Sequence, residues 1–104
     1  MGKSHVAEGV NMVPIHPGRI LRREMVAREL SANRLALSLR VPSGRISDIL
    51  NGKRGISPET ALRLARYFGT SATFWVNLQA RYDLAIADRA LGAKIAAEVP
   101  KAAA

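Results

Sequence analysis

The chain has 104 residues, which is enough for one small domain with its own hydrophobic core and too few for two. It contains no cysteine, so a disulfide framework, a thiol nucleophile and a cysteine-based zinc site are excluded. The formal net charge is +8, and residues 17–54 carry nine basic and three acidic side chains. A basic segment of this kind attracts polyanions, of which nucleic acid is one.

The first part of the chain is expected to be an arm followed by a helix. Residues 1–14 contain two glycines and show no apolar periodicity, which indicates a flexible N-terminal arm. From about Arg19 to Glu29 an apolar stripe at helical spacing predicts a helix, and its members are Ile20, Leu21 and Met25. His16 lies just before this helix, and we assign it a structural role at the helix entry rather than a metal-binding or catalytic one.

Two short helices joined by a tight turn are predicted between Ser31 and Arg54, an arrangement typical of a helix-turn-helix. Ser31 is a favourable N-cap, Pro42 suits the start of the second helix, and Asn51-Gly52 suits its end. Each helix has an apolar face at helical spacing, made of Leu35, Ala36 and Leu39 in the first and of Ile46, Ile49 and Leu50 in the second. These faces are the candidate core of the chain.

The other side of the second helix is polar and carries an arginine. It presents Gly44, Ser47 and Asp48, flanked by Ser43 and Arg45, and Lys53-Arg54 follow the helix. A DNA major groove accepts an α-helix, and an arginine can donate two hydrogen bonds to a guanine edge. An ordinary helical hairpin with a solvated polar face is the alternative. DNA binding is favoured by three features together: the length of the turn, the basic pair Lys53-Arg54 after Gly52, and the net charge.

A third signal predicts a helix from Pro58 to Phe68. Ser57 is its expected N-cap, Glu59 complements its positive end, and Gly69 ends it. The predicted buried face of this helix consists of Ala61, Leu64, Ala65 and Phe68.

The last helix is expected to begin at a cap formed by Thr70 or Ser71 and to carry an aromatic-rich stripe. This stripe either completes the core of the monomer or forms a two-fold contact, and the polar tips of Trp and Tyr favour the contact. The residues expected at this dimer interface are Phe74, Trp75, Leu78, Gln79 and Tyr82. The alanine-rich segment that follows is either a marginal helix that orders on a partner or a frayed tail, and both readings stay open.

With these residues in place, the chain resembles the HigA-type antitoxins, a branch of the phage-repressor-like (XRE) helix-turn-helix family. The resemblance covers roughly residues 14–86. It rests on His16-Pro17-Gly18, Asn33-Arg34-Leu35-Ala36, Val41-Pro42, Arg45-Ile46-Ser47, Asn51-Gly52-Lys53-Arg54-Gly55, the run from Thr60 to Thr70, and Phe74-Trp75 through Asn77-Leu78-Gln79 to Tyr82-Asp83-Leu84.

The resemblance implies an all-α, five-helix phage-repressor-like domain with a short N-terminal arm and an alanine-rich C-terminal tail. The expected organisation is an arm at residues 1–14, a helix-turn-helix domain with a dimerisation helix at 15–83, and the tail at 84–104. By analogy, the residues nearest the bases are Ser43, Gly44, Arg45, Ser47 and Asp48 in a recognition helix. The phosphate contacts are assigned to Ser31, Asn33, Arg34, Arg40, Lys53 and Arg54.

The same resemblance implies a homodimer that binds an inverted-repeat operator in its own promoter. It also implies a partner, a HigB-like, RelE-type mRNA-cleaving toxin that the chain neutralises. The alternative is a stand-alone dimeric repressor without a toxin. We expect no cofactor, no metal and no catalytic residues, because the carboxylates are scattered and no phosphate-cradling glycine loop is present. A cytoplasmic, nucleoid-associated location is expected, since no stretch has the pattern of a signal peptide or a membrane span.

Three positions depart from the family pattern. Arg19 stands where the family usually has Glu, and Ala32 stands where a Gln commonly reaches the DNA. Arg40 occupies a turn position that normally holds Gly. If this turn requires a positive φ, Arg40 is strained there, and a phosphate contact would offset that cost.

Overall fold

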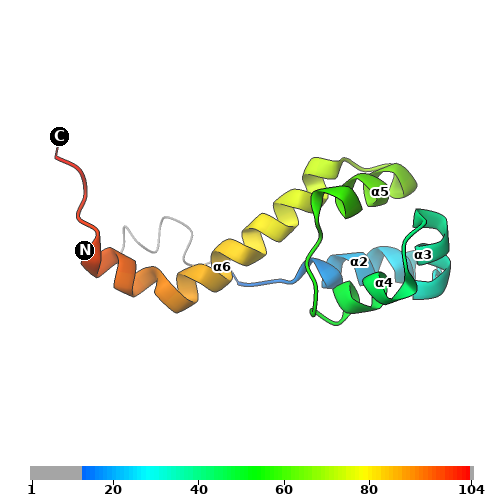
Figure 1. The fold of residues 1–104 in the computed structure, drawn as a ribbon, viewed down its shortest axis with the longest axis horizontal. Coiled ribbons are helices and arrows are strands. Elements are labelled where there is room, and N and C mark those ends of the chain that lie inside the picture. Colours follow the sequence, from blue (N-terminus) through cyan, green and yellow to red (C-terminus); the bar gives the residue numbers. More distant parts are fainter. Residues whose placement is uncertain (1–12, 104) are drawn as a thin grey trace. The chain divides into compact units, whose positions relative to one another are not determined.

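The computed structural model describes residues 13–103, and in this range it contains α-helices and no strand (Figure 1). The helices are α2 (Pro17–Ala27), α3 (Ala32–Leu39), α4 (Ser43–Leu50), α5 (Pro58–Phe68) and α6 (Ala72–Glu98). The predicted all-α, five-helix fold is therefore confirmed for the described residues. The predicted arm at residues 1–14 lies almost entirely outside them.

The described chain divides into two compact units. Residues 15–80 form one unit, which holds α2 to α5 and the first part of α6, and residues 81–103 belong to the other. The alanine-rich segment is helical as far as Glu98, because α6 continues through it without a break.

Side-chain caps explain where the first helices begin. The Nδ1 atom of His16 accepts a hydrogen bond of 2.9 Å from the Gly18 N–H, which confirms the structural role predicted for this histidine. This cap and the fixed φ of Pro17 favour a helical first turn, so α2 begins at Pro17, two residues before the predicted start at Arg19. Ser31 caps α3 and Ser57 caps α5, each accepting from the N–H group three residues ahead.

One face of each helix contributes to a single hydrophobic core in the unit of residues 15–80. The apolar faces predicted for α2, α3, α4 and α5 are all buried or partly buried. The buried residues of this core are Leu21, Met25, Leu35, Ala36, Leu39, Ile46, Ile49, Ile56, Ala61, Leu64, Phe68 and Trp75.

The helix α4 is seated on both α2 and α3. Its Ile46 and Ile49 side chains are fully buried, so the apolar face of α4 points into the core. At its last turn the contact with α2 is made by backbone, because a Cβ atom at Gly18 would overlap the carbonyl oxygen of Ile49. Only glycine permits this approach, and it fixes where the C-terminal end of α4 lies against α2.

The placement of Trp75 corrects one part of the interface prediction. Its side chain is fully buried within this single chain, and its Nε1–H donates a 2.9 Å hydrogen bond to Thr70 Oγ1. A side chain enclosed in the monomer core cannot also face a second copy, so Trp75 is a core residue. Ser71 rather than Thr70 caps α6, since its Oγ accepts from the Phe74 N–H at 3.0 Å.

The turn between α3 and α4 holds a non-glycine residue in the left-handed region. Arg40 has φ 61° and ψ 45°, and its N–H donates to Leu37 O at 3.2 Å. The condition stated in the sequence analysis, a positive φ at this turn, is therefore met. For an L-residue with a Cβ atom this conformation costs on the order of 1 kcal/mol.

Replacing Arg40 by glycine is expected to relieve this strain. Arg40→Gly should leave the free energy of unfolding unchanged or raise it by up to about 1 kcal/mol, while weakening DNA binding through the lost cation. Thermal unfolding and equilibrium DNA binding measure the two effects. Glu29→Gly is the matched control, because Glu29 also has a positive φ of 53° but carries no positive charge. A lower melting temperature for Arg40→Gly, or an unchanged DNA affinity, would contradict the expectation.

Candidate nucleic-acid interface

The five residues predicted to lie nearest the bases all lie on α4. Ser43 and Gly44 are exposed at its N-terminal end, and a Cβ atom at Gly44 would meet no neighbour within 4 Å. Ser47 and Asp48 are half-buried on the next turn. The Arg45 side chain is 25% exposed, so its stem is packed while part of it reaches solvent. This side of α4 is polar and offers hydrogen-bond donors and acceptors of the kind that a base edge can pair with.

The C-terminal end of α4 fixes the two basic residues that follow it. Gly52 adopts φ 74°, and the N–H groups of Lys53 and Arg54 both donate to Asp48 O, at 2.8 Å and 3.2 Å. These bonds satisfy a carbonyl at the end of the helix and hold the exit loop against it. The Arg54 guanidinium also lies 3.9 Å from the Asp48 carboxylate. Lys53 and Arg54 are thereby placed beside the polar side of α4, and both remain exposed.

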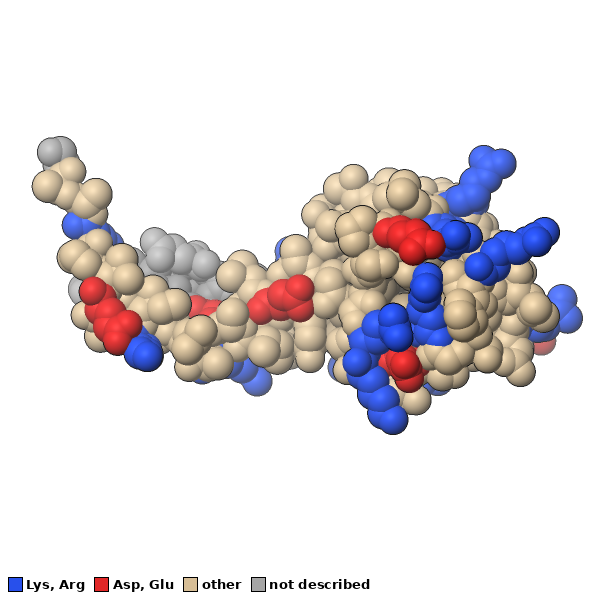
Figure 2. All heavy atoms as spheres, in the orientation of Figure 1, with Lys and Arg blue, Asp and Glu red and all other residues tan. Residues whose placement is uncertain are grey.

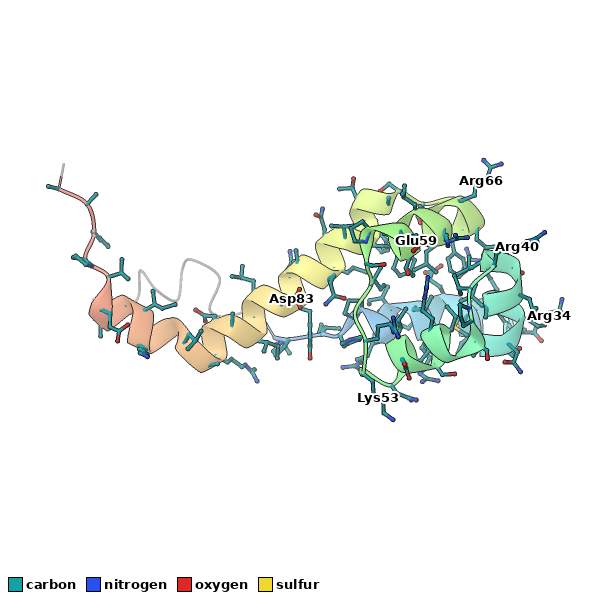
Figure 3. All side chains as sticks on the ribbon, in the orientation of Figure 1. Arg34, Arg40, Lys53, Glu59, Arg66 and Asp83 are labelled. Atoms are coloured by element: carbon teal, nitrogen blue, oxygen red, sulfur yellow. The ribbon has the colours of Figure 1, made fainter. Side chains whose placement is uncertain are left out.

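The other candidate phosphate contacts are exposed as well. Ser31, Asn33 and Arg34 lie at the N-terminal end of α3, and Ser31 uses its oxygen as the cap of that helix. Figure 2 shows basic side chains gathered over the unit of residues 15–80 on the face in view. In Figure 3, Arg34, Arg40 and Lys53 project outward from this unit. Their charges are available to a polyanion along this face.

Arg40 also borders an open pocket between the end of α3 and α5. The pocket has a volume of about 350 Å³, and its lining residues are Ser38, Leu39, Arg40, Leu62, Arg63, Arg66 and Tyr67. Arg66, like Arg40, points away from the body of the unit in Figure 3. The basic character of the face therefore extends from α4 onto α5.

The structure reveals an ionic contact that the sequence analysis missed. Glu59 Oε1 lies 3.9 Å from Arg45 Nη1, and Glu59 Oε2 lies 3.0 Å from Arg63 Nη2. The Glu59–Arg63 pair has the i, i+4 spacing that a sequence can reveal. Glu59 and Arg45 lie on different helices, and their approach depends on the tertiary fold, in which α3 packs against both α4 and α5. No local sequence pattern indicates it.

Gln79, predicted at a dimer interface, has a role inside the chain. Its Oε1 accepts a 2.7 Å hydrogen bond from the Ile56 N–H, and a Cβ atom at Gly55 would overlap its amide group. Leu78 packs against the core, whereas Phe74 is 41% exposed. Among these three, Phe74 is the exposed large apolar side chain.

Among residues 13–103 no group of three or more His, Cys, Asp or Glu side chains is placed to hold a metal ion. In the same described range, no helix is both long enough and apolar enough to span a bilayer.

The fold and the polar side of α4 define a helix-turn-helix protein, and comparisons with known proteins agree. Residues 21–75 match the family model described as helix-turn-helix. Virulence-associated protein I of Dichelobacter nodosus is 48% identical over 86 residues, which span 81% of this chain and 80% of that protein.

Two solved structures are similar over most of this chain. An addiction module antidote protein of the HigA family from Coxiella burnetii is 49% identical with a TM-score of 0.84, covering 88% of this chain and 100% of that one. Antitoxin HigA of Pseudomonas aeruginosa, solved with the higBA promoter, is 46% identical with a TM-score of 0.85 and the same coverage. The chain belongs to the helix-turn-helix family, in the branch of the HigA-type antitoxins. This is a family of DNA-binding proteins and not of enzymes.

Removing the arginine of α4 is expected to reduce sequence discrimination. If Arg45 donates two hydrogen bonds to one guanine, Arg45→Ala should lose about 1–3 kcal/mol of discrimination at one base pair and should affect unrelated DNA less. Equilibrium binding to a preferred duplex and to a shuffled duplex measures this difference. Arg23→Ala, at an exposed position of α2, is the control for the loss of one charge. An equal loss on both duplexes would argue against base readout by Arg45.

Removing the two basic residues after α4 is expected to change the salt dependence of binding. The double variant Lys53→Ala/Arg54→Ala should reduce the slope of log affinity against log salt concentration by about 2, because each phosphate contact releases counterions. The loss should be similar on all DNA sequences. Arg81→Ala/Arg89→Ala, which removes two exposed charges from α6, should leave the slope nearly unchanged. An unaltered slope in the first variant would mean that Lys53 and Arg54 do not touch the backbone.

Proposed function

We propose that this chain is the antitoxin of a type II toxin–antitoxin module. It acts as a homodimer that represses its own promoter and neutralises a HigB/RelE-like mRNA-cleaving toxin. The single observation that carries the proposal is the similarity, at 46% identity over the whole of the other chain, to a HigA antitoxin solved with the higBA promoter.

The DNA-binding part of the proposal rests on α4. Its polar side carries Ser43, Arg45 and Ser47, and the exposed basic residues Lys53 and Arg54 follow it, which is the chemistry expected of a major-groove reader. In a two-fold dimer, two copies of α4 would enter successive major grooves about 34 Å apart and read an inverted repeat. Arg45 is assigned to a guanine edge, Ser43 and Ser47 to adaptable hydrogen bonds, and Asp48 to a cytosine amino group.

The dimer part of the proposal draws on α6. Several of its apolar side chains are exposed in the single chain: Phe74, Val76, Leu84, Ile86, Leu91 and Ile95. Exposed apolar side chains of this kind are what homodimers bury. The toxin would supply the ribonuclease chemistry, and the complex would reside in the cytoplasm with the nucleoid.

Purification from the native host tests the partner. The protein is tagged at its own locus, the lysate is treated with nuclease, and chains recovered at equal stoichiometry are identified by mass spectrometry. We expect a small basic protein encoded next to this gene, toxic when expressed alone and harmless when expressed with this chain. Recovery of the homodimer alone, with no such neighbouring gene, would leave a stand-alone repressor and remove the toxin from the account.

A further inference from the structure

Glu59 lies in the first turn of α5, and its two carboxylate oxygens face different partners. Oε2 accepts a hydrogen bond from Arg63 Nε at 3.1 Å and lies 3.0 Å from Arg63 Nη2. Oε1 lies 3.9 Å from Nη1 of Arg45, the arginine of α4. Figure 3 shows Glu59 on the side of α5 that faces α4. The Glu59 carboxylate is therefore shared between the Arg63 guanidinium of α5 and the Arg45 guanidinium of α4.

Arg63 is itself fixed at a second point. Its Nη1 donates a 2.9 Å hydrogen bond to the carbonyl oxygen of Leu39, the last residue of α3. Carbonyls at the end of a helix have no partner within the helix, so this charge-assisted bond fills a vacant acceptor. Because Arg63 is held at α3, the Glu59 carboxylate that it binds cannot turn freely. The chain of contacts runs from the end of α3 through α5 to α4.

We propose that Glu59 is a positioning residue that sets the sequence discrimination of this protein by orienting the Arg45 guanidinium toward the bases. The contact with Glu59 uses Nη1 of Arg45 and leaves the edge formed by Nε and Nη2 for two hydrogen bonds to a guanine. An unrestrained arginine samples many rotamers, and holding it in one of them favours the base that fits that geometry. This inference rests on the proposed role of Arg45 in base readout.

A different effect of Glu59 must be separated from this one. A carboxylate near the DNA repels phosphates, and that repulsion applies equally to every sequence. Positioning of Arg45 changes the ratio of affinities for two sequences, whereas repulsion changes both affinities by one factor. The ratio is therefore the quantity to measure.

The test uses the full chain and duplexes selected by the wild-type protein from a randomised pool. Single base-pair substitutions identify the position at which Arg45→Ala loses discrimination. At that position Glu59→Gln is expected to lower the ratio of affinities for the preferred and the substituted duplex by about fivefold. This is part of the discrimination that the contact between Arg45 and the base provides. In the Arg45→Ala background Glu59→Gln should cause no further change in the ratio, because it acts through Arg45.

The matched control is Glu24→Gln on α2. Glu24 also pairs with an arginine four residues ahead, Arg28, at 2.6 Å, and its substitution removes the same charge. It should leave the ratio unchanged. The inference is overturned if Glu59→Gln changes the affinities for both duplexes by one common factor. It is also overturned if Glu59→Gln changes the ratio of affinities by the same amount in the Arg45→Ala background as in the wild type. A wild-type protein that selects no sequence would instead contradict the proposed function.

Discussion

The seating of α4 is the constraint on which the rest of the structure depends. Ile46 and Ile49 are fully buried, and the Ile49 carbonyl lies so close to Gly18 that no Cβ atom fits between them. These contacts fix both the rotation and the position of α4 against α2. Ser43, Gly44, Ser47 and Asp48 reach the surface because the opposite face of the helix is committed to the core. A helix that must enter a groove needs this kind of rigid support.

Much of this arrangement was predictable from the sequence, because local signals and tertiary packing agree. The caps at Ser31 and Ser57, the stop at Gly69 and the apolar faces of α3, α4 and α5 are all present as predicted. The positive φ at Arg40 was a conditional expectation that came from the family resemblance, in which this turn position usually holds glycine, and Arg40 has φ 61°.

The features that were missed depend on contacts between residues far apart in sequence. An aromatic stripe suits a core as well as an interface, and only the packing of Trp75 against Phe68, with ring centroids 6.0 Å apart, places it in the core. Gln79 was expected to face a second copy, yet it binds the backbone of Ile56, 23 residues away. Likewise, the contact between Glu59 and Arg45 joins two helices, α5 and α4, that both pack against α3. Periodicity identifies the face of a helix but not its neighbour.

In the proposed function, the polar side of α4 reads a DNA sequence. The most direct measurement is equilibrium binding of the wild-type protein, at near-physiological salt, to the DNA upstream of its own gene and to a shuffled duplex of the same composition. We expect the upstream DNA to bind at least about a thousandfold more tightly than the shuffled duplex. Equal affinities for the two duplexes would mean that the basic face binds DNA as a polyanion only, and would contradict the account.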